Sequence, residues 1–119
     1  MLSHKKDKEL LVLKAMDVIA DLTRERVPEN GIFQPVSVIF DYPGTSFACK
    51  LKVEKGYQQT NSRCITAGMY RRGDDRLVSN YLYFGTKEEI LAWLSAPENS
   101  SLLINTYEHL AERAKSFDD

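Results

Sequence analysis

The first twenty-six residues repeat apolar side chains with the period of an α-helix. The apolar positions are Leu11, Val12, Ala15, Val18, Ile19 and Leu22. At the helical angle these side chains occupy about one third of the circumference, and Lys14, Asp17 and Asp21 lie opposite them. The pattern predicts an amphipathic helix over about residues 5–26, which Pro28 and the pair Asn30-Gly31 bring to an end.

From residue 36 the apolar side chains recur at every second position. The alternating positions are Val36, Val38 and Phe40, then Phe47, Cys49, Leu51 and Val53, then Ile65, Ala67 and Met69, then Val78, Leu82 and Phe84. Turn sequences separate these runs: Tyr42-Pro43-Gly44-Thr45, a polar segment at residues 55–61, and RRGDDR at residues 71–76. Consecutive strands with no helix between them predict an antiparallel meander in which the strands follow chain order.

The alternation also predicts which face of the sheet each side chain occupies. Residues with the parity of Val38, Leu51, Met69 and Leu82 are expected to pack against helices. The opposite parity, here called the outer face, contains Lys50, Lys52, Cys64, Thr66, Tyr70, Ser79, Tyr81 and Tyr83. No helix is expected over this face.

The last part of the chain returns to helical periodicity. Thr86 and Glu89 have the spacing of a capping box, and Ser95 and Glu98 suggest a second one. Apolar residues at Leu103, Tyr107, Leu110, Ala114 and Phe117 then predict the final helix. The order α-β-β-β-β-α-α is an α+β two-layer sandwich: a four-stranded antiparallel meander with helices on one face, which we expect to form a single domain over residues 1–119.

Charge is distributed unevenly along a chain whose formal net charge is only -1. Residues 50–76 carry seven Lys/Arg against three Asp/Glu, a surplus of +4, whereas residues 77–119 carry three against seven, a balance of -4. A near-neutral total argues against a nucleic-acid backbone as the main partner, because domains with that partner are usually clearly basic. Because residues 50–76 are basic, nucleic-acid binding by this segment remains a weaker hypothesis.

The chain shows neither the apolar stretch of a signal peptide nor that of a membrane-spanning helix. The chain has only two cysteines, without the spacing of a disulfide-stabilised secreted domain, which fits a reducing compartment. We therefore expect a cytoplasmic protein with no membrane partner. The tripeptide Arg72-Gly73-Asp74 within RRGDDR would suggest adhesion in an extracellular protein. Between two alternating stretches it is instead expected to form a hairpin turn.

Residue types that commonly carry chemistry are sparse. His4 lies near the terminus, and His109 is expected on the solvent side of the last helix. Cys49 and Cys64 are expected on opposite faces of the sheet, where they cannot form a disulfide; Cys49 fits the core and Cys64 a half-exposed position. The sequence contains no phosphate loop, nucleophile elbow or paired metal-ligand motif. We therefore expect no catalytic residues, no metal and no cofactor.

The outer face is the remaining candidate for function. Its interaction residues are predicted to be Lys50, Lys52, Thr66, Tyr70, Tyr81 and Tyr83. Tyrosine is enriched at protein interfaces, which favours a small non-enzymatic module that binds another protein or a second copy of itself. Tyrosines among lysines could instead stack the bases of a single-stranded nucleic acid. A small-ligand site between helices and sheet is a third hypothesis, and a solvated face on which Tyr and Thr only favour strand structure is the alternative to all three.

Overall fold

Helices flank a block of consecutive strands in the computed structural model, which describes residues 4–56, 61–74 and 76–118. The elements are α1 (His4–Arg26), β1 (Val36–Asp41), β2 (Phe47–Lys55), β3 (Arg63–Arg71), β4 (Leu77–Gly85), α2 (Lys87–Leu94), α3 (Asn99–Ala114) and a closing 3-10 turn, η1 (Lys115–Asp118). The predicted α+β order is confirmed, and the first helix ends at the predicted residue.

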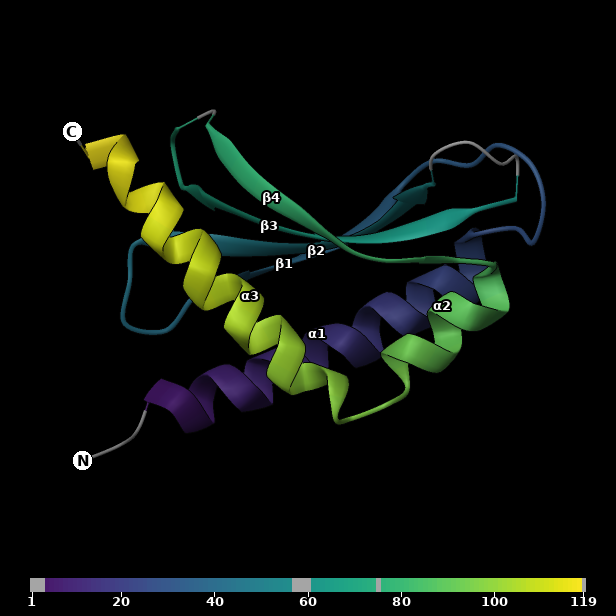
Figure 1. The fold of residues 1–119 in the computed structure, drawn as a ribbon, viewed down its shortest axis with the longest axis horizontal. Helices are drawn as coiled ribbons and strands as arrows, with labels where there is room; N and C mark the ends of the chain where they lie inside the picture. Colours follow the sequence, from purple (N-terminus) through teal and green to yellow (C-terminus); the bar gives the residue numbers. More distant parts are fainter. Residues whose placement is uncertain (1–3, 57–60, 75, 119) are drawn as a thin grey trace.

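The strands form one antiparallel sheet in the order β1-β2-β3-β4, as the meander predicts. Figure 1 shows α1, α2 and α3 together on one side of this sheet, while no described element covers the other side. The helices bury the side chains of one parity: Val36, Phe47, Cys49, Leu51, Val53, Ile65, Ala67 and Met69. Burial of this apolar layer is the main favourable contribution to folding.

The helical layer is built from the two ends of the chain. Helix α1 packs mainly on β1, whereas α3 packs on β3 and β4. Lys8 Nζ on α1 lies 2.9 Å from Glu108 Oε1 on α3, and the same ammonium lies 4.5 Å from the centroid of the Tyr42 ring. At the far end of α3, Arg113 donates to the side-chain oxygen of Asn80 on β4 (3.0 Å). These polar contacts fix α3 between the first helix and the last strand.

A β-bulge changes the parity of β4. Ile65 on β3 is opposite Tyr83 and the next residue, Thr66, is opposite Tyr81, so Leu82 is an extra residue in the ladder. Because an extra residue exchanges the faces of everything beyond it, the predicted parity is wrong for the end of this strand. Tyr83 faces the helices and stacks on Trp93 of α2, with ring centroids 6.2 Å apart. Phe84, expected in the core, lies on the outer face.

The first predicted capping box is present and the second is not. The N–H of Glu89 donates to Thr86 Oγ1 (3.2 Å), and the N–H of Thr86 donates to the Glu89 carboxylate (3.0 Å). Ser95 instead follows the last turn of α2, and α3 begins after Glu98 without a side-chain cap. The Asn99 side chain donates to the carbonyl of Trp93 (2.8 Å), which joins the two helices at their corner.

The cysteines lie on opposite faces, as predicted, and both are free. Cys49 belongs to the core. Cys64 is on the outer face but is fully buried rather than half-exposed, because it lies in the ladder between Glu54 and Phe84. Burial raises the pKa of both thiols above the ordinary value, so neither is a reactive thiolate near neutral pH.

We expect the protein to be indifferent to redox conditions. Thiol titration in denaturant should find two free thiols, and the native protein should react slowly because both sulfurs are buried. The melting temperature should be the same with and without reductant, since the sheet separates Cys49 from Cys64. A drop of several degrees on adding reductant would show that a disulfide forms and that this arrangement is wrong.

Candidate interaction surface

The outer face consists of cross-strand rows whose membership follows from the strand register. From β1 to β4 the rows are Asp41, Ala48, Tyr70 and Leu77; Ile39, Lys50, Gly68 and Ser79; Ser37, Lys52, Thr66 and Tyr81; and Glu54, Cys64 and Phe84. Five of the six predicted interaction residues, Lys50, Lys52, Thr66, Tyr70 and Tyr81, are therefore on this face. The sixth, Tyr83, is on the helical side, because the extra residue Leu82 reverses the parity of the positions that follow it.

A hollow of about 190 Å³ lies at the centre of the outer face. Its floor is Gly68, which has no side chain to fill the row between Lys50 and Ser79. A Cβ atom at this position would lie 3.1 Å from Leu77 Cδ1, so Leu77 leans over the glycine. The remaining lining residues are Lys52, Glu54, Thr66 and Tyr81. The hollow thus combines hydroxyl, ammonium and carboxylate groups with the apolar side chain of Leu77 and the ring of Tyr81.

Most charges near the hollow are already paired. Lys52 Nζ lies 3.2 Å from Glu54 Oε2, and Thr66 Oγ1 donates to the same carboxylate oxygen (2.9 Å). At the edge of the face, Arg72 pairs with Asp41 at 2.8 Å. Among the described residues no carboxylate lies within ion-pair distance of Lys50. In the described part of the chain, Lys50 thus brings a positive charge without an ion-pair partner to the hollow.

Three large apolar side chains of β4 are exposed on the outer face, of which Leu77 and Tyr81 line the hollow and Phe84 lies beyond Tyr81. Leu77 is 48% exposed, Tyr81 55% and Phe84 44%, and the rings of Tyr81 and Phe84 lie with their centroids 5.5 Å apart. We call these three residues the β4 ridge. Sequence reasoning placed Tyr81 here but missed Phe84, since the bulge reverses its parity, and did not count Leu77 as an interaction residue.

The surplus of basic residues in the middle segment does not collect on the outer face. Arg63 is buried on the helical side, where its guanidinium donates twice to the carbonyl of Pro28 (2.8 and 3.2 Å) and lies 4.7 Å from the centroid of Phe33. Arg71 lies over the ring of Phe47 on the same side of the sheet. Two of the four arginines of this segment therefore lie on the helical side, and their charge is not on the outer face.

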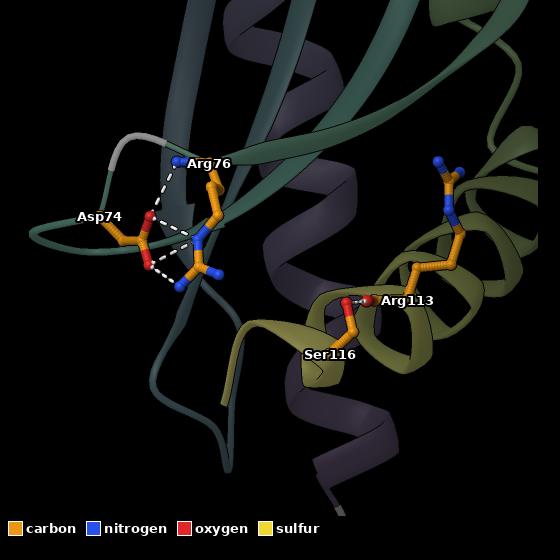
Figure 2. A network of polar contacts seen from close by, with 4 residues as sticks. All are labelled: Asp74, Arg76, Arg113 and Ser116. Carbon is orange, nitrogen blue, oxygen red and sulfur yellow. Dashed lines mark hydrogen bonds and ion pairs between the residues drawn. The ribbon is translucent and has the colours of Figure 1, made fainter. Parts of the chain in front are cut away.

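The RRGDDR segment forms the predicted hairpin connection between β3 and β4. The N–H of Asp74 donates to the carbonyl of Arg71 (3.0 Å), and Gly73 has φ +86°, a conformation that side chains disfavour. Figure 2 shows the Asp74 carboxylate turned toward Arg76, which donates to it from its backbone N–H (2.9 Å) and its guanidinium. These hydrogen bonds lower the pKa of Asp74 to about 2. The carboxylate of the tripeptide is thus engaged within the hairpin.

The described residues lack the features of a metal centre and of a membrane-spanning helix. No group of three or more His, Cys, Asp or Glu side chains there is arranged to hold a metal ion, and His109 lies exposed on α3. No helix in the described part of the chain is long and apolar enough to span a bilayer. Comparison of the chain with protein-family models, with curated proteins and with solved structures gives no match.

The two tyrosines at the bulge should respond differently to truncation. Tyr83→Ala removes a half-buried ring that stacks on Trp93, so it should lower the free energy of unfolding by about 1–2 kcal/mol. Tyr81→Ala removes an exposed ring and should change it by no more than about 0.5 kcal/mol. Urea denaturation followed by circular dichroism measures both. Equal losses would mean that the two rings share one face and that the bulge is misplaced.

Proposed function

We propose that this protein is a small binding module that contacts another protein through the outer face, with the β4 ridge as the apolar centre of the contact. The observation that carries the proposal is the exposure of Leu77, Tyr81 and Phe84 on the outer face of one strand, where the rings of Tyr81 and Phe84 contact each other and Ser79 lies between Leu77 and Tyr81. A sheet face that only meets water has no need of three large exposed apolar side chains on one strand, and such patches mark interaction sites.

The chemistry around the ridge fits a protein partner. Aromatic rings offer a large contact area and lose little rotamer entropy when they are covered, which is why a few of them often dominate an interface. Lys50 stands beside the ridge with a charge that no described carboxylate neutralises, so a partner with an acidic side chain at this point gains specificity. A second copy of the chain is included among the protein partners to be tested.

The test compares wild type with a Tyr81→Ala/Phe84→Ala double variant. Leu102→Ala is a matched control, since Leu102 on α3 is also apolar and similarly exposed (46%). Light scattering over a range of concentrations measures self-association, and affinity capture with quantitative mass spectrometry measures other partners. The double variant should lose the partner that wild type and Leu102→Ala both retain, whether that partner is a second copy or a different protein. Identical partners for all three proteins would contradict the proposal.

Single-stranded nucleic acid is the second candidate, and one observation favours it. The tilted pair Tyr81 and Phe84 presents two exposed rings, and Tyr81 lines the same hollow as Lys50. Base stacking on exposed rings tolerates any sequence. The pairing of Lys52 with Glu54 leaves few cations to follow a phosphate backbone, which makes this candidate the weaker one. Fluorescence anisotropy with a labelled oligonucleotide tests it: binding should weaken steeply with salt and disappear in the double variant.

A further inference from the structure

The edge of the sheet at β1 differs from the edge at β4. Among the described residues β1 pairs only with β2, so the other side of the strand presents unpaired backbone N–H and C=O groups. Its sequence is VSVIFD, its register with β2 contains no bulge, and its single charge, Asp41, is paired with Arg72. Natural proteins usually protect such an edge with a bulge, a lysine or a covering element, because a flat apolar edge recruits another strand. The β4 edge has a bulge at Leu82, and β1 has none.

A groove of about 230 Å³ runs beside this open edge on the helical side. Its walls are Leu11, Lys14, Ala15 and Val18 from α1 and Val38, Ile39 and Phe40 from β1. Helix α1 packs mainly against β1 beneath the sheet (Figure 1). Since the groove is lined by these two elements and β1 is an edge strand, the groove lies next to the unpaired backbone. A strand that paired with β1 would direct every second side chain into this groove, because side chains alternate between the two faces of a sheet.

The charges of the groove indicate what kind of strand fits it. Lys14 is the charged residue among the lining residues, and no carboxylate in the described ranges lies within ion-pair distance of it. It stands beside Val38, Ile39 and Phe40, the middle of β1. A second copy that paired its own β1 here about a two-fold axis would bring two Lys14 side chains together, which costs energy. An acidic side chain from a different protein would instead be attracted.

We propose that the β1 edge and the adjoining groove, together the β1 groove, bind an extended segment of another protein that adds a strand to the sheet. The segment has apolar side chains at alternate positions, which enter the groove against Leu11, Val18 and Phe40, and an Asp or Glu that pairs with Lys14. Main-chain hydrogen bonds to β1 provide affinity, and the groove and the ion pair provide specificity. This site lies at the β1 edge, whereas the β4 ridge lies on the opposite edge strand, and Ile39 is the residue that the groove shares with the outer face. The proposal stands independently of the function proposed for the β4 ridge.

The first test selects binders for the full chain from a displayed library of random linear peptides. The enriched peptides should carry alternating apolar residues and at least one Asp or Glu. Val18→Asp places a charge in the groove at a partly exposed helix position and should weaken binding of the best synthetic peptide by at least about tenfold. Leu102→Asp makes the same change at an exposed apolar residue that does not line the groove, and should leave the affinity unchanged.

Two further measurements separate strand addition from adhesion to an apolar patch. Lys14→Glu should weaken binding by about tenfold, and changing the acidic residue of the peptide to lysine should restore it. N-methylation of alternate peptide amides should abolish binding for the set of amides that faces β1 and leave it intact for the other set. In the complex, backbone amides of β1 at the open edge should become protected from hydrogen exchange.

The proposal is overturned if the library yields no binder, or if the binders ignore both Val18→Asp and Lys14→Glu. It is also overturned if N-methylation of either set has the same effect, since no strand then forms. Binders that lose affinity for the Tyr81→Ala/Phe84→Ala variant and keep it for Val18→Asp would locate recognition on the outer face instead. That last result would leave the protein-binding function standing and remove only the β1 groove.

Discussion

Replacing Leu51 with Asp should unfold the protein, whereas replacing its neighbour Lys50 with Asp should cost less than about 1 kcal/mol. Leu51 is fully buried in β2, between β1 and β3 and beneath the helices. A carboxylate there has no cation to pair with, and an unpaired buried charge costs several kcal/mol, a large part of the stability of a domain this size. Lys50 lies one residue away on the opposite face, where water solvates either charge.

Far-ultraviolet circular dichroism and thermal melting measure this contrast. Leu51→Asp should show no cooperative melting transition, while Lys50→Asp should melt within a few degrees of wild type. The two substitutions introduce the same side chain at adjacent positions, so differences in helix or strand propensity are small. Two variants that melt alike would mean that β2 does not separate a core face from an outer face.

Truncating Tyr107 should cause the second large loss of stability. Tyr107 is fully buried on α3, with its ring in edge-to-face contact with Phe40 at 5.6 Å and its hydroxyl donating to the carbonyl of Lys50 (2.8 Å). Tyr107→Ala should lower the free energy of unfolding by about 3–5 kcal/mol, because it leaves a cavity between α3 and the sheet. Tyr107→Phe retains the ring and loses one hydrogen bond, which should cost about 1 kcal/mol.

The same residue predicts a dependence on alkaline pH. Burial raises the pKa of Tyr107 well above its ordinary value of 10.0. Above that ordinary value the unfolded chain releases the phenolic proton and the folded chain retains it, so the free energy of unfolding should fall as pH rises past about 10. Urea denaturation of wild type and Tyr107→Phe at neutral and alkaline pH measures this. A wild-type slope no steeper than that of Tyr107→Phe would contradict a buried phenol.

Periodicity was sufficient to predict most elements, because each pattern had a single reading. Six apolar residues of α1 with helical spacing share about one third of its circumference, and β2 alternates Phe47, Cys49, Leu51 and Val53 with smaller or charged residues. In β4 both parities are apolar or aromatic, since Leu77 and Tyr81 are followed by Leu82, Tyr83 and Phe84. The two polar residues of the strand, Ser79 and Asn80, have opposite parities and so mark neither face. Nothing in the sequence indicates the extra residue at Leu82, and the positions of Tyr83 and Phe84 could not be predicted.

The candidate surfaces depend on properties that a single sequence does not contain. The hollow exists because register places Gly68 between Lys50 and Ser79, three residues from three different strands. The charge surplus of residues 50–76 suggested a basic face, but the sequence does not record that Arg63 turns inward to the carbonyl of Pro28. The β1 groove likewise requires the packing of α1 against the sheet edge.

The assembly of the helical layer from both ends of the chain has a consequence for synthesis on the ribosome. The strands emerge consecutively and can pair as neighbouring hairpins while translation continues. Helix α3, which packs on β3 and β4, emerges after all four strands. Until it does, the apolar side of β3 and β4 lacks this cover, and a nascent chain in that state is prone to aggregate or to bind chaperones. A stalled or truncated product that ends before residue 99 would therefore carry a formed sheet with an exposed, aggregation-prone apolar face.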